Sequence, residues 1–152
     1  KSASQAEIGR ALDISIREAG SHDADTIIGI WQKCGLTRPW NDPLADFTLA
    51  LSNSGSTILI AEDADALIGT VMTGFDGHRG WIYYLGTVAH RQNQGIARQL
   101  IGAAENWLAA RGCPKVELMV RTGNPAAGFY EKIGWEKQDV AVYARWLNTK
   151  EV

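Results

Sequence analysis

Residues 81–112, WIYYLGTVAHRQNQGIARQLIGAAENWLAARG, combine a short apolar strand, a polar turn and a long amphipathic helix. Aromatic and apolar residues predict the strand over 81–88, and Gly86 interrupts it. A glycine inside a strand marks either a local twist or bulge, or a place where another group approaches the backbone. Apolar residues recur at helical spacing over 96–108, and Gly112 ends that pattern.

The turn before this helix has the character of an anion site. It runs from Gln92 to Ala97, and no Asp, Ser or Thr directly precedes Gly95, so the first helical amides lack an obvious side-chain acceptor. Free amides at a helix N-terminus bind anions, Gly95 lets a phosphate approach the backbone, and Arg98 adds positive charge. The alternative is a tight turn capped by Asn93 or by water.

Outside this stretch, short apolar runs alternate with helical patterns. The polar tetrad 62–65 between two apolar runs predicts a hairpin. The order of elements predicts a mixed sheet that helices cover on both faces. We expect strands over 13–17, 56–61, 66–75, 81–88, 115–120 and 140–147, one extra short strand near 135–137, and helices over 23–34, 44–51, 96–108 and 126–133.

The composition is that of one domain. The chain has 152 residues, 45% of them hydrophobic, and we expect a single domain over 13–152. Residues 1–12 are expected to be an N-terminal extension that is disordered or left over from cloning. With 15 Lys and Arg against 17 Asp and Glu, the net charge of -2 argues against a protein that grips nucleic acid by bulk charge.

Membrane, metal and disulfide chemistry are not indicated by the sequence. No apolar run approaches the roughly 18 residues of a membrane span, and the first residues lack a signal-peptide pattern. Cys34 and Cys113 show no paired spacing, which favours a reducing, cytoplasmic location. His22, His78 and His90 are scattered, so we expect no metal.

Two motifs are similar to those of one known family. Gln92-x-x-Gly95-x-Ala97 resembles the pyrophosphate-binding motif of the GCN5-related N-acetyltransferases (GNAT), which bind acetyl-coenzyme A (acetyl-CoA). The segment NPAAGFYEKIGW at 124–135 resembles a later motif of the same family. The two motifs occur in the family order, each in its expected strand or helix context.

Shorter stretches resemble a bacterial branch of this family, the YpeA-type acetyltransferases. These stretches are RPWNDP at 38–43 and DGHRG at 76–80. The resemblance as a whole extends over residues 13–147, approximately. It implies an α/β (α+β) fold, a three-layer αβα sandwich around a mixed, mostly antiparallel sheet of six to seven strands, with the fourth and fifth strands splayed apart.

The resemblance also implies where acetyl-CoA binds. The pantetheine arm would lie between the splayed strands and pair with the backbone of the fourth, and the pyrophosphate would lie on the amides of the turn. The residues expected to bind acetyl-CoA are Leu85, Gly86, Thr87, Gln92, Asn93, Gln94, Gly95, Ile96, Ala97, Arg98, Asn124 and Tyr130.

The implied chemistry is transfer of an acetyl group to a primary amine by direct attack in a ternary complex. Tyr130 resembles the tyrosine that acts as general acid toward the departing sulfur, and a backbone N–H near Leu85 or Gly86 resembles the oxyanion donor. The alternative for Tyr130 is an aromatic side chain that only packs beside Phe129. Neither cysteine lies near the motifs in sequence, which favours direct transfer over an acyl-cysteine route.

The chain departs from the family pattern in two places. Asn124 precedes Tyr130 by six residues where seven is commoner, and Met119 stands where a related branch has a glutamate base. The general base is therefore unassigned. Two rival functions stay open, a non-catalytic acyl-CoA-binding module and a nucleotide-binding α/β domain. The candidate bases are Asp76, His78, Glu117, Tyr83, Tyr84 and water.

The acceptor is expected to be an amine of a small molecule, a protein N-terminus or a lysine. Strand alternation predicts that Tyr83 and Tyr84 point to opposite faces, so only one would line the acceptor cleft. The edge at 140–147 could pair with a second copy in a homodimer. The residues nominated for acceptor binding are Arg38, Trp40, Asn41, Asp42, Asp76, His78, Arg79 and Tyr83.

Overall fold

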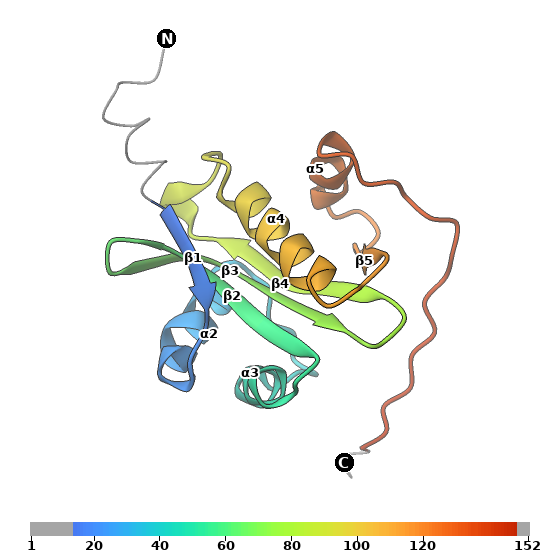
Figure 1. Cartoon of the computed structure of the whole chain (residues 1–152), viewed down its shortest axis with the longest axis horizontal. Helices are drawn as coiled ribbons and strands as arrows, with labels where there is room; N and C mark the ends of the chain where they lie inside the picture. Colours follow the sequence, from blue (N-terminus) through green and yellow to red (C-terminus); the bar gives the residue numbers. More distant parts are fainter. Residues whose placement is uncertain (1–13, 149–152) are drawn as a thin grey trace. The chain divides into compact units, whose positions relative to one another are not determined.

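A computed structural model describes residues 14–148 of the chain. These residues divide into two compact units, one ending at Met119 and the other beginning at Val120. Figure 1 traces the elements in chain order. The expected extension over residues 1–12 lies outside the described residues.

The first unit is built on a five-stranded sheet whose strand order in space follows the chain. The first four strands are antiparallel to their neighbours, and the fifth runs parallel to the fourth. The predicted hairpin over the tetrad 62–65 is confirmed, because Asp63 pairs with Ala66. The strands are β1 (Ile14–Glu18), β2 (Ser56–Asp63), β3 (Ala66–Phe75), β4 (Gly80–Thr87) and β5 (Val116–Leu118).

Helices cover both faces of this sheet. In Figure 1, α2 (Ala24–Lys33) and α3 (Pro43–Ser52) lie on one side of the strands and α4 (Ile96–Ala109) on the other. The second unit contains one helix, α5 (Ala126–Lys132), among its described residues. The predicted mixed sheet between two helical layers is therefore present in the first unit.

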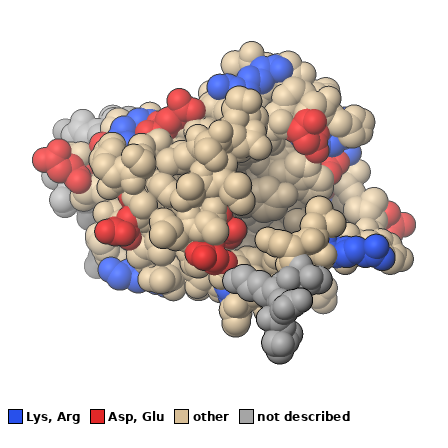
Figure 2. All heavy atoms as spheres, turned by 90° about the horizontal axis from the view of Figure 1, so that it is seen from below, with Lys and Arg blue, Asp and Glu red and all other residues tan. Residues whose placement is uncertain are grey.

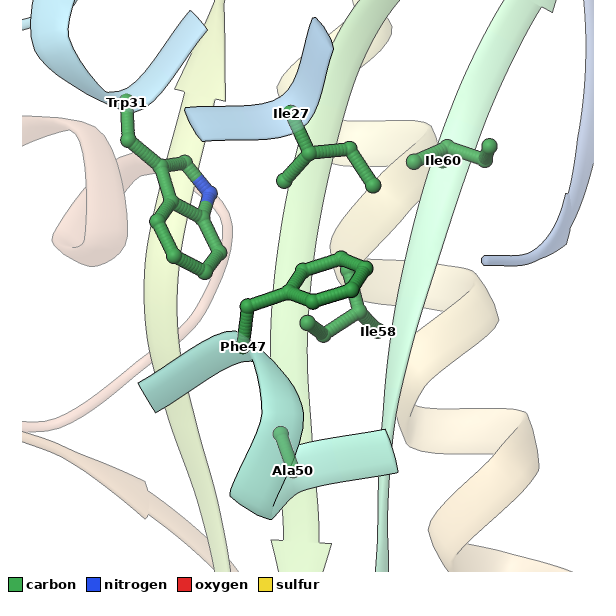
Figure 3. Close-up of a cluster of buried hydrophobic side chains, with 6 residues drawn as sticks. All are labelled: Ile27, Trp31, Phe47, Ala50, Ile58 and Ile60. Atoms are coloured by element: carbon green, nitrogen blue, oxygen red, sulfur yellow. The ribbon is translucent and has the colours of Figure 1, made fainter. Parts of the chain in front are cut away.

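A hydrophobic cluster fixes α2 and α3 on their face of the sheet (Figure 3). Trp31 is fully buried, its ring lies 6.4 Å from that of Phe47, and its indole N–H donates to Thr70 Oγ1 at 3.1 Å. Each fully buried side chain of this size contributes about 1.5–3 kcal/mol. The members of the cluster are Ile27, Trp31, Phe47, Ala50, Ile58 and Ile60.

Two strand glycines let α4 pack closely on the opposite face. A Cβ at Gly80 would lie 2.7 Å from Leu108 Cδ1, and one at Gly69 would lie 3.0 Å from Leu100 Cδ1. Both leucines are buried, and Ile96 at the start of the helix is 1% exposed. The N-terminus of α4 is therefore held at a fixed place beside the end of β4.

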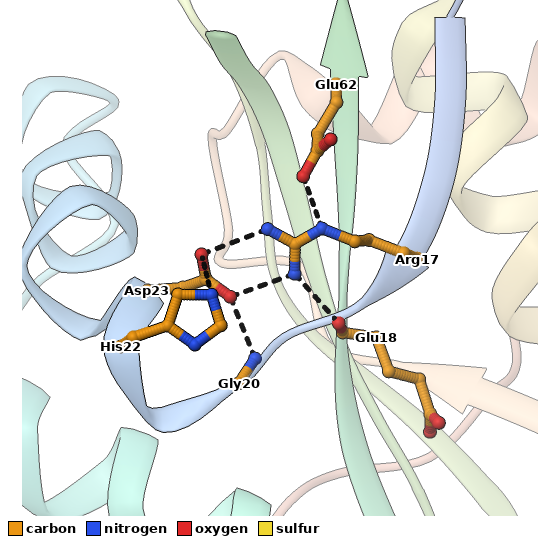
Figure 4. Close-up of polar contacts among 6 residues, drawn as sticks. All are labelled: Arg17, Glu18, Gly20, His22, Asp23 and Glu62. Atoms are coloured by element: carbon orange, nitrogen blue, oxygen red, sulfur yellow. Dashed lines mark hydrogen bonds and ion pairs between the residues drawn. The ribbon is translucent and has the colours of Figure 1, made fainter. Parts of the chain in front are cut away.

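A buried carboxylate ties β1 to the start of α2 (Figure 4). Asp23, 6% exposed, accepts from the Arg17 guanidinium at 2.9 and 3.0 Å and from the Gly20 amide at 2.8 Å. Arg17 also donates to Glu62 on β2. The hydrogen bonds from Arg17, more than its charge, lower the pKa of Asp23 to about 2.

The predicted strands over 140–147 and near 135–137 are wrong, and the sheet has five strands among residues 14–148 where six to seven were expected. Alternating apolar residues form a strand only when a neighbouring backbone supplies hydrogen-bond partners. No described strand pairs with this segment. Its apolar side chains are accordingly exposed: Val140, Val142, Tyr143, Trp146 and Leu147.

The two last strands are paired at one end only. Gly80, Trp81 and Ile82 of β4 face Val116, Glu117 and Leu118 of β5. From Tyr83 onward, no described strand pairs with that edge of β4. The C-terminal half of β4 thus offers backbone groups along one edge, directly before the turn that leads into α4.

Candidate active site

The turn between β4 and α4 has the backbone shape of an anion site. Asn93 and Gly95 both adopt left-handed conformations, with φ of 63° and 80°, and such turns gather successive amides on one side. Gly95 precedes the helix, and its carbonyl accepts the first helical bond from Gln99 at 3.1 Å. A Cβ at Gly95 would meet no atom within 4 Å, so the space in front of it is open.

No described side chain caps the start of α4. The alternative in which Asn93 performs that role is therefore wrong for the described structure. Gln94 Oε1 instead accepts from Arg91 Nε at 2.8 Å, and Arg91 Nη1 reaches Asp63 Oδ2 at 2.7 Å. The first turn of α4 carries no acidic residue and presents an exposed Arg98. The contacts of Arg91 thus hold the turn before α4 in place, while no described side chain caps the first amides of the helix.

The end of β4 has two features that suit a bound ligand. Thr87 Oγ1 is buried and has no hydrogen-bond partner among the described residues, a situation that costs about 1–3 kcal/mol unless a ligand or water satisfies the hydroxyl. Gly86 faces this chain's own side chains, because a Cβ there would lie 2.9 Å from Leu36 Cδ1 and 3.2 Å from Cys34 Sγ. Two side chains of this chain, Leu36 and Cys34, therefore come close to the Gly86 backbone, as predicted for a glycine inside a strand.

A bulge reshapes β4 just before these residues. Met72 pairs with Tyr83 and Thr70 with Gly86, so β4 contains one residue more than β3 over this stretch. Tyr84 has a φ of 51°. The expectation that the two tyrosines face opposite sides is wrong, because both Tyr83 and Tyr84 line one pocket. The left-handed residue breaks the strict alternation of an extended strand.

That pocket lies between α3 and strands β2 to β4 and has a volume of about 350 Å³. Tyr84 donates from its hydroxyl to Asp46 Oδ2 at 2.6 Å, and its ring stacks on Trp31 at 3.9 Å. Burial, followed by the hydrogen bond to Asp46, raises the pKa of Tyr84 well above its usual value. The pocket is lined by Asn41, Asp46, Leu49, Ala50, Asn53, Ser56, Met72, Thr73, Gly74, Tyr83 and Tyr84.

The residues nominated for acceptor binding separate into two groups. Tyr83 and Asn41 line the pocket, and burial raises the pKa of Tyr83. Arg38 donates to the carbonyls of its own loop, and Asp42 caps α3 by accepting from the amides of Leu44 and Ala45. Trp40 is 54% exposed and is not part of the pocket lining.

The loop after β3 is held by Asp76. Its Oδ1 accepts from the amides of His78 and Arg79, both at 2.8 Å. These two hydrogen bonds from backbone amides lower the pKa of Asp76, and the one from Arg79 contributes most. Asp76 is therefore a poor proton acceptor, and it serves first to shape the loop that carries the exposed His78.

Asp46 is the residue that sequence reasoning missed. It lies on α3 directly before the buried Phe47, and nothing in the local pattern distinguishes it from a solvated helical acid. Its partner Tyr84 is 38 positions away in the chain. A weak signal existed, since a carboxylate beside the apolar stripe of a helix lies near the edge of the core.

The second unit holds the two remaining predicted residues. Tyr130 lies between the rings of Phe129 and Trp135, at 5.2 and 5.8 Å, and burial raises the pKa of Tyr130. Tyr130 therefore does pack against neighbouring aromatic side chains. The role of its hydroxyl as a general acid stays a prediction. Asn124 Oδ1 accepts from the Ala126 amide at 2.9 Å, so this side chain shapes the start of α5.

Residues 14–148 show neither a membrane-spanning helix nor a metal-binding cluster. No described helix is both long and apolar enough to cross a membrane. In the same part of the chain, no group of three or more His, Cys, Asp or Glu side chains is placed to hold a metal ion.

Comparison with known proteins identifies relatives over most of the chain. The profile of the acetyltransferase (GNAT) family matches residues 24–135. An acetyltransferase of Yersinia enterocolitica is 42% identical over 135 residues, which cover 88% of this chain and 96% of that protein. An acetyltransferase of Pectobacterium atrosepticum is 44% identical with the same coverage.

Solved structures share the fold at much lower identity. An aminoglycoside N-acetyltransferase in complex with CoA has a TM-score of 0.76 at 18% identity, covering 89% of this chain and 95% of that chain. A protein of Clostridium acetobutylicum described as a predicted acetyltransferase, with acetyl-CoA, has a TM-score of 0.73 at 19% identity, covering 91% and 99%.

Proposed function

Because the chain belongs to the acetyltransferase (GNAT) family, we propose that it transfers the acetyl group of acetyl-CoA to a primary amine by direct attack in a ternary complex. The observation that carries this proposal is the uncapped start of α4, with Gly95 left-handed and open space before it. A diphosphate there would accept hydrogen bonds from free amides at the positive end of the helix dipole.

The residues before the turn fit the rest of the co-substrate. The edge of β4 beyond Ile82 pairs with no described strand, and backbone groups of Leu85 to Thr87 would bind the pantetheine arm there. The unpartnered Thr87 hydroxyl would gain a partner in the complex. Solved proteins of the same fold hold CoA or acetyl-CoA, which supports the same co-substrate here.

The proposed reaction replaces one carbon–sulfur bond with one carbon–nitrogen bond. Acetyl-CoA supplies the acetyl group as a thioester, whose carbon–sulfur bond breaks as the amine nitrogen bonds to the carbonyl carbon. A backbone N–H of Leu85 or Gly86 stabilises the negative charge that develops on the carbonyl oxygen. Tyr130 donates its proton to the departing sulfur, and its raised pKa keeps it protonated at neutral pH. The amine loses its proton to water, and the Tyr130 phenolate takes a proton back from solvent before the next turnover.

Cys34 lies beside Gly86, but its protonation state favours direct transfer over an acyl-cysteine route. Burial raises the pKa of Cys34, which keeps it a thiol, and the thiolate is the nucleophilic form. We place the protein in the cytoplasm, where thiols stay reduced. The acceptor is an amine of a small molecule or of a protein. An aminoglycoside acetyltransferase of the same fold was solved with sisomicin, which is consistent with a small-molecule acceptor.

The test compares Tyr130→Phe with Tyr143→Phe, a matched change at a side chain that is 94% exposed. Acetyl-CoA affinity is measured by calorimetry, and transfer is measured as thiol release over a panel of amines and peptides. We expect Tyr130→Phe to lower kcat about a hundredfold with little change in acetyl-CoA affinity, and Tyr143→Phe to match the wild type.

Two results would count against the proposal in different ways. Acetyl-CoA binding without turnover on any amine would favour the rival function of a non-catalytic acyl-CoA-binding module. Unchanged turnover in Tyr130→Phe would remove Tyr130 from the mechanism while leaving the transferase itself in place.

A further inference from the structure

We infer that the pocket between α3 and β4 binds a second positive charge of the acceptor, so that the substrate class is an amine carrying another cationic group, which Asp46 holds. This inference rests on the proposed acetyltransfer. It adds a charge requirement to an acceptor that is otherwise proposed only to be an amine.

The pocket carries one unbalanced negative charge. Asp46 is the only Asp, Glu, Lys, Arg or His among its lining residues. Within residues 14–148, its carboxylate forms no ion pair, and its only hydrogen bond is the one that Oδ2 accepts from the Tyr84 hydroxyl. A neutral donor leaves the charge uncompensated, and a cation at Oδ1 would supply the stronger, charge-assisted bond.

The carboxylate is held in place before any ligand arrives. Tyr84 donates to it, and the Tyr84 ring stacks on Trp31, which is itself fully buried and hydrogen-bonded to Thr70. Thr70 Oγ1 in turn donates to the Tyr84 carbonyl at 3.1 Å. This chain of contacts fixes the charge, so little ordering cost remains when a cation binds.

The walls of the pocket suit an aliphatic body. Leu49, Ala50 and Met72 contribute apolar surface, and two of the lining side chains, Leu49 and Tyr83, are exposed. Asp46 and Asn53, both lining residues, are seven positions apart on or beside α3, a separation of about 10 Å along the helix axis. Figure 2 views the side of the molecule on which α2 and α3 lie, where acidic side chains border uncharged surface.

The position of the pocket relates it to the proposed chemistry. Tyr84 directly precedes Leu85, whose backbone is proposed to face the thioester. A cation at Asp46 would therefore be separated from the reacting carbonyl by about the length of the Tyr84 side chain. That spacing separates the cation from the reacting amine, which must be neutral to attack.

The binding experiment uses pentane diamine and pentanediol, a cationic and a neutral probe of equal length, titrated calorimetrically into the full chain. The variant is Asp46→Asn, which keeps an oxygen to accept from Tyr84 and removes the charge. The matched control is Asp65→Asn, at the exposed hairpin turn between β2 and β3. We expect the wild type and Asp65→Asn to bind the diamine at least about tenfold tighter than the diol, and Asp46→Asn to lose that preference.

A kinetic arm separates this inference from the proposed function. Thiol release is followed with pentane diamine and with pentylamine, and we expect kcat/KM to favour the diamine about tenfold in the wild type and to become equal in Asp46→Asn, mainly through KM. Equal binding of diamine and diol, or a preference that survives in Asp46→Asn, overturns the inference. Charge-dependent binding with no transfer to any amine would instead refute the acetyltransferase and leave the cation site standing.

Discussion

The two ligand sites proposed around the C-terminal half of β4 would recognise their ligands by different means. At one, the turn into α4 offers backbone amides shaped by Asn93 and Gly95, and no described side chain caps them. At the other, the pocket depends on side chains, with Asp46 fixed through Tyr84 and Trp31. The difference teaches that a backbone site leaves a local trace in sequence, whereas a side-chain site assembled from distant elements does not.

The largest predicted effect is at the backbone site. Gly95→Val would place bulk where a phosphate must approach and remove charge-assisted hydrogen bonds worth about 1.5–3 kcal/mol each, so we expect acetyl-CoA affinity to fall at least about a hundredfold. Gly112→Val is the control, because Gly112 follows the other end of the same helix with a φ of 79° and open space. Calorimetry with acetyl-CoA and thermal melts measure both variants.

Backbone strain is matched between these two variants. Each valine would be forced into a left-handed conformation at a cost of about 1–3 kcal/mol, so both should lower the melting temperature by a similar amount. Equal acetyl-CoA affinity in the two variants would contradict a phosphate site at Gly95.

A smaller effect should appear at Gly86, which lies on β4 between the pocket residue Tyr84 and the turn into α4. Gly86→Ala would push a methyl group against Leu36 and Cys34, and overpacking of this kind costs about 1–3 kcal/mol. Gly102→Ala, at an open position inside α4, should instead stabilise the fold by about 0.5–1 kcal/mol. Denaturant unfolding distinguishes the two signs. A Gly86→Ala protein of wild-type stability that no longer binds acetyl-CoA would assign this glycine to the ligand alone.

The smallest predicted effect concerns the contact between Arg17 and Asp23, which ties β1 to the start of α2, the helix that carries Trp31. Because the pKa of Asp23 is lowered from 3.8 to about 2, its pairing with Arg17 stabilises the fold above pH 3.8, and the contribution is lost as the pH falls toward 2. Arg17 is 39% exposed, and solvent screens the pair, so we expect on the order of 1 kcal/mol.

The variant that checks this value is Asp23→Asn, compared with the wild type in urea unfolding across the acid range. The variant should be less stable at neutral pH, and its free energy of unfolding should fall less steeply below pH 3.8. Parallel pH profiles for the two proteins would show that the Arg17 contact contributes nothing. Acetyl-CoA affinity should be the same in both proteins, since the turn lies elsewhere.

Much of the fold could be predicted from periodicity. The runs that became β2 and β3 are β-branched and apolar with clear breakers, α4 has a strong 3.6-residue pattern, and the helix Ile96–Ala109 begins where Gly95 indicated. The segment 140–147, predicted as an alternating strand, is equally apolar and forms no strand. An apolar pattern reports on side chains only, and whether a backbone partner is present depends on the rest of the chain.

The candidate site divides in the same way. The anion turn was visible because it needs a glycine and lacks a capping residue. The pocket was not, because a bulge at Tyr84 brings two consecutive tyrosines to one cavity and because Asp46 acquires its role only through a partner far along the chain. Strand alternation from the sequence alone cannot anticipate a bulge.

Amide hydrogen exchange, with and without acetyl-CoA, tests the central claim most directly. The amides of residues 93–98 have no described side-chain cap, and they should become strongly protected when acetyl-CoA binds, while the amides of α3 beside the pocket should change little until an amine is added. Acetyl-CoA binding that leaves the exchange of residues 93–98 unchanged would contradict the account.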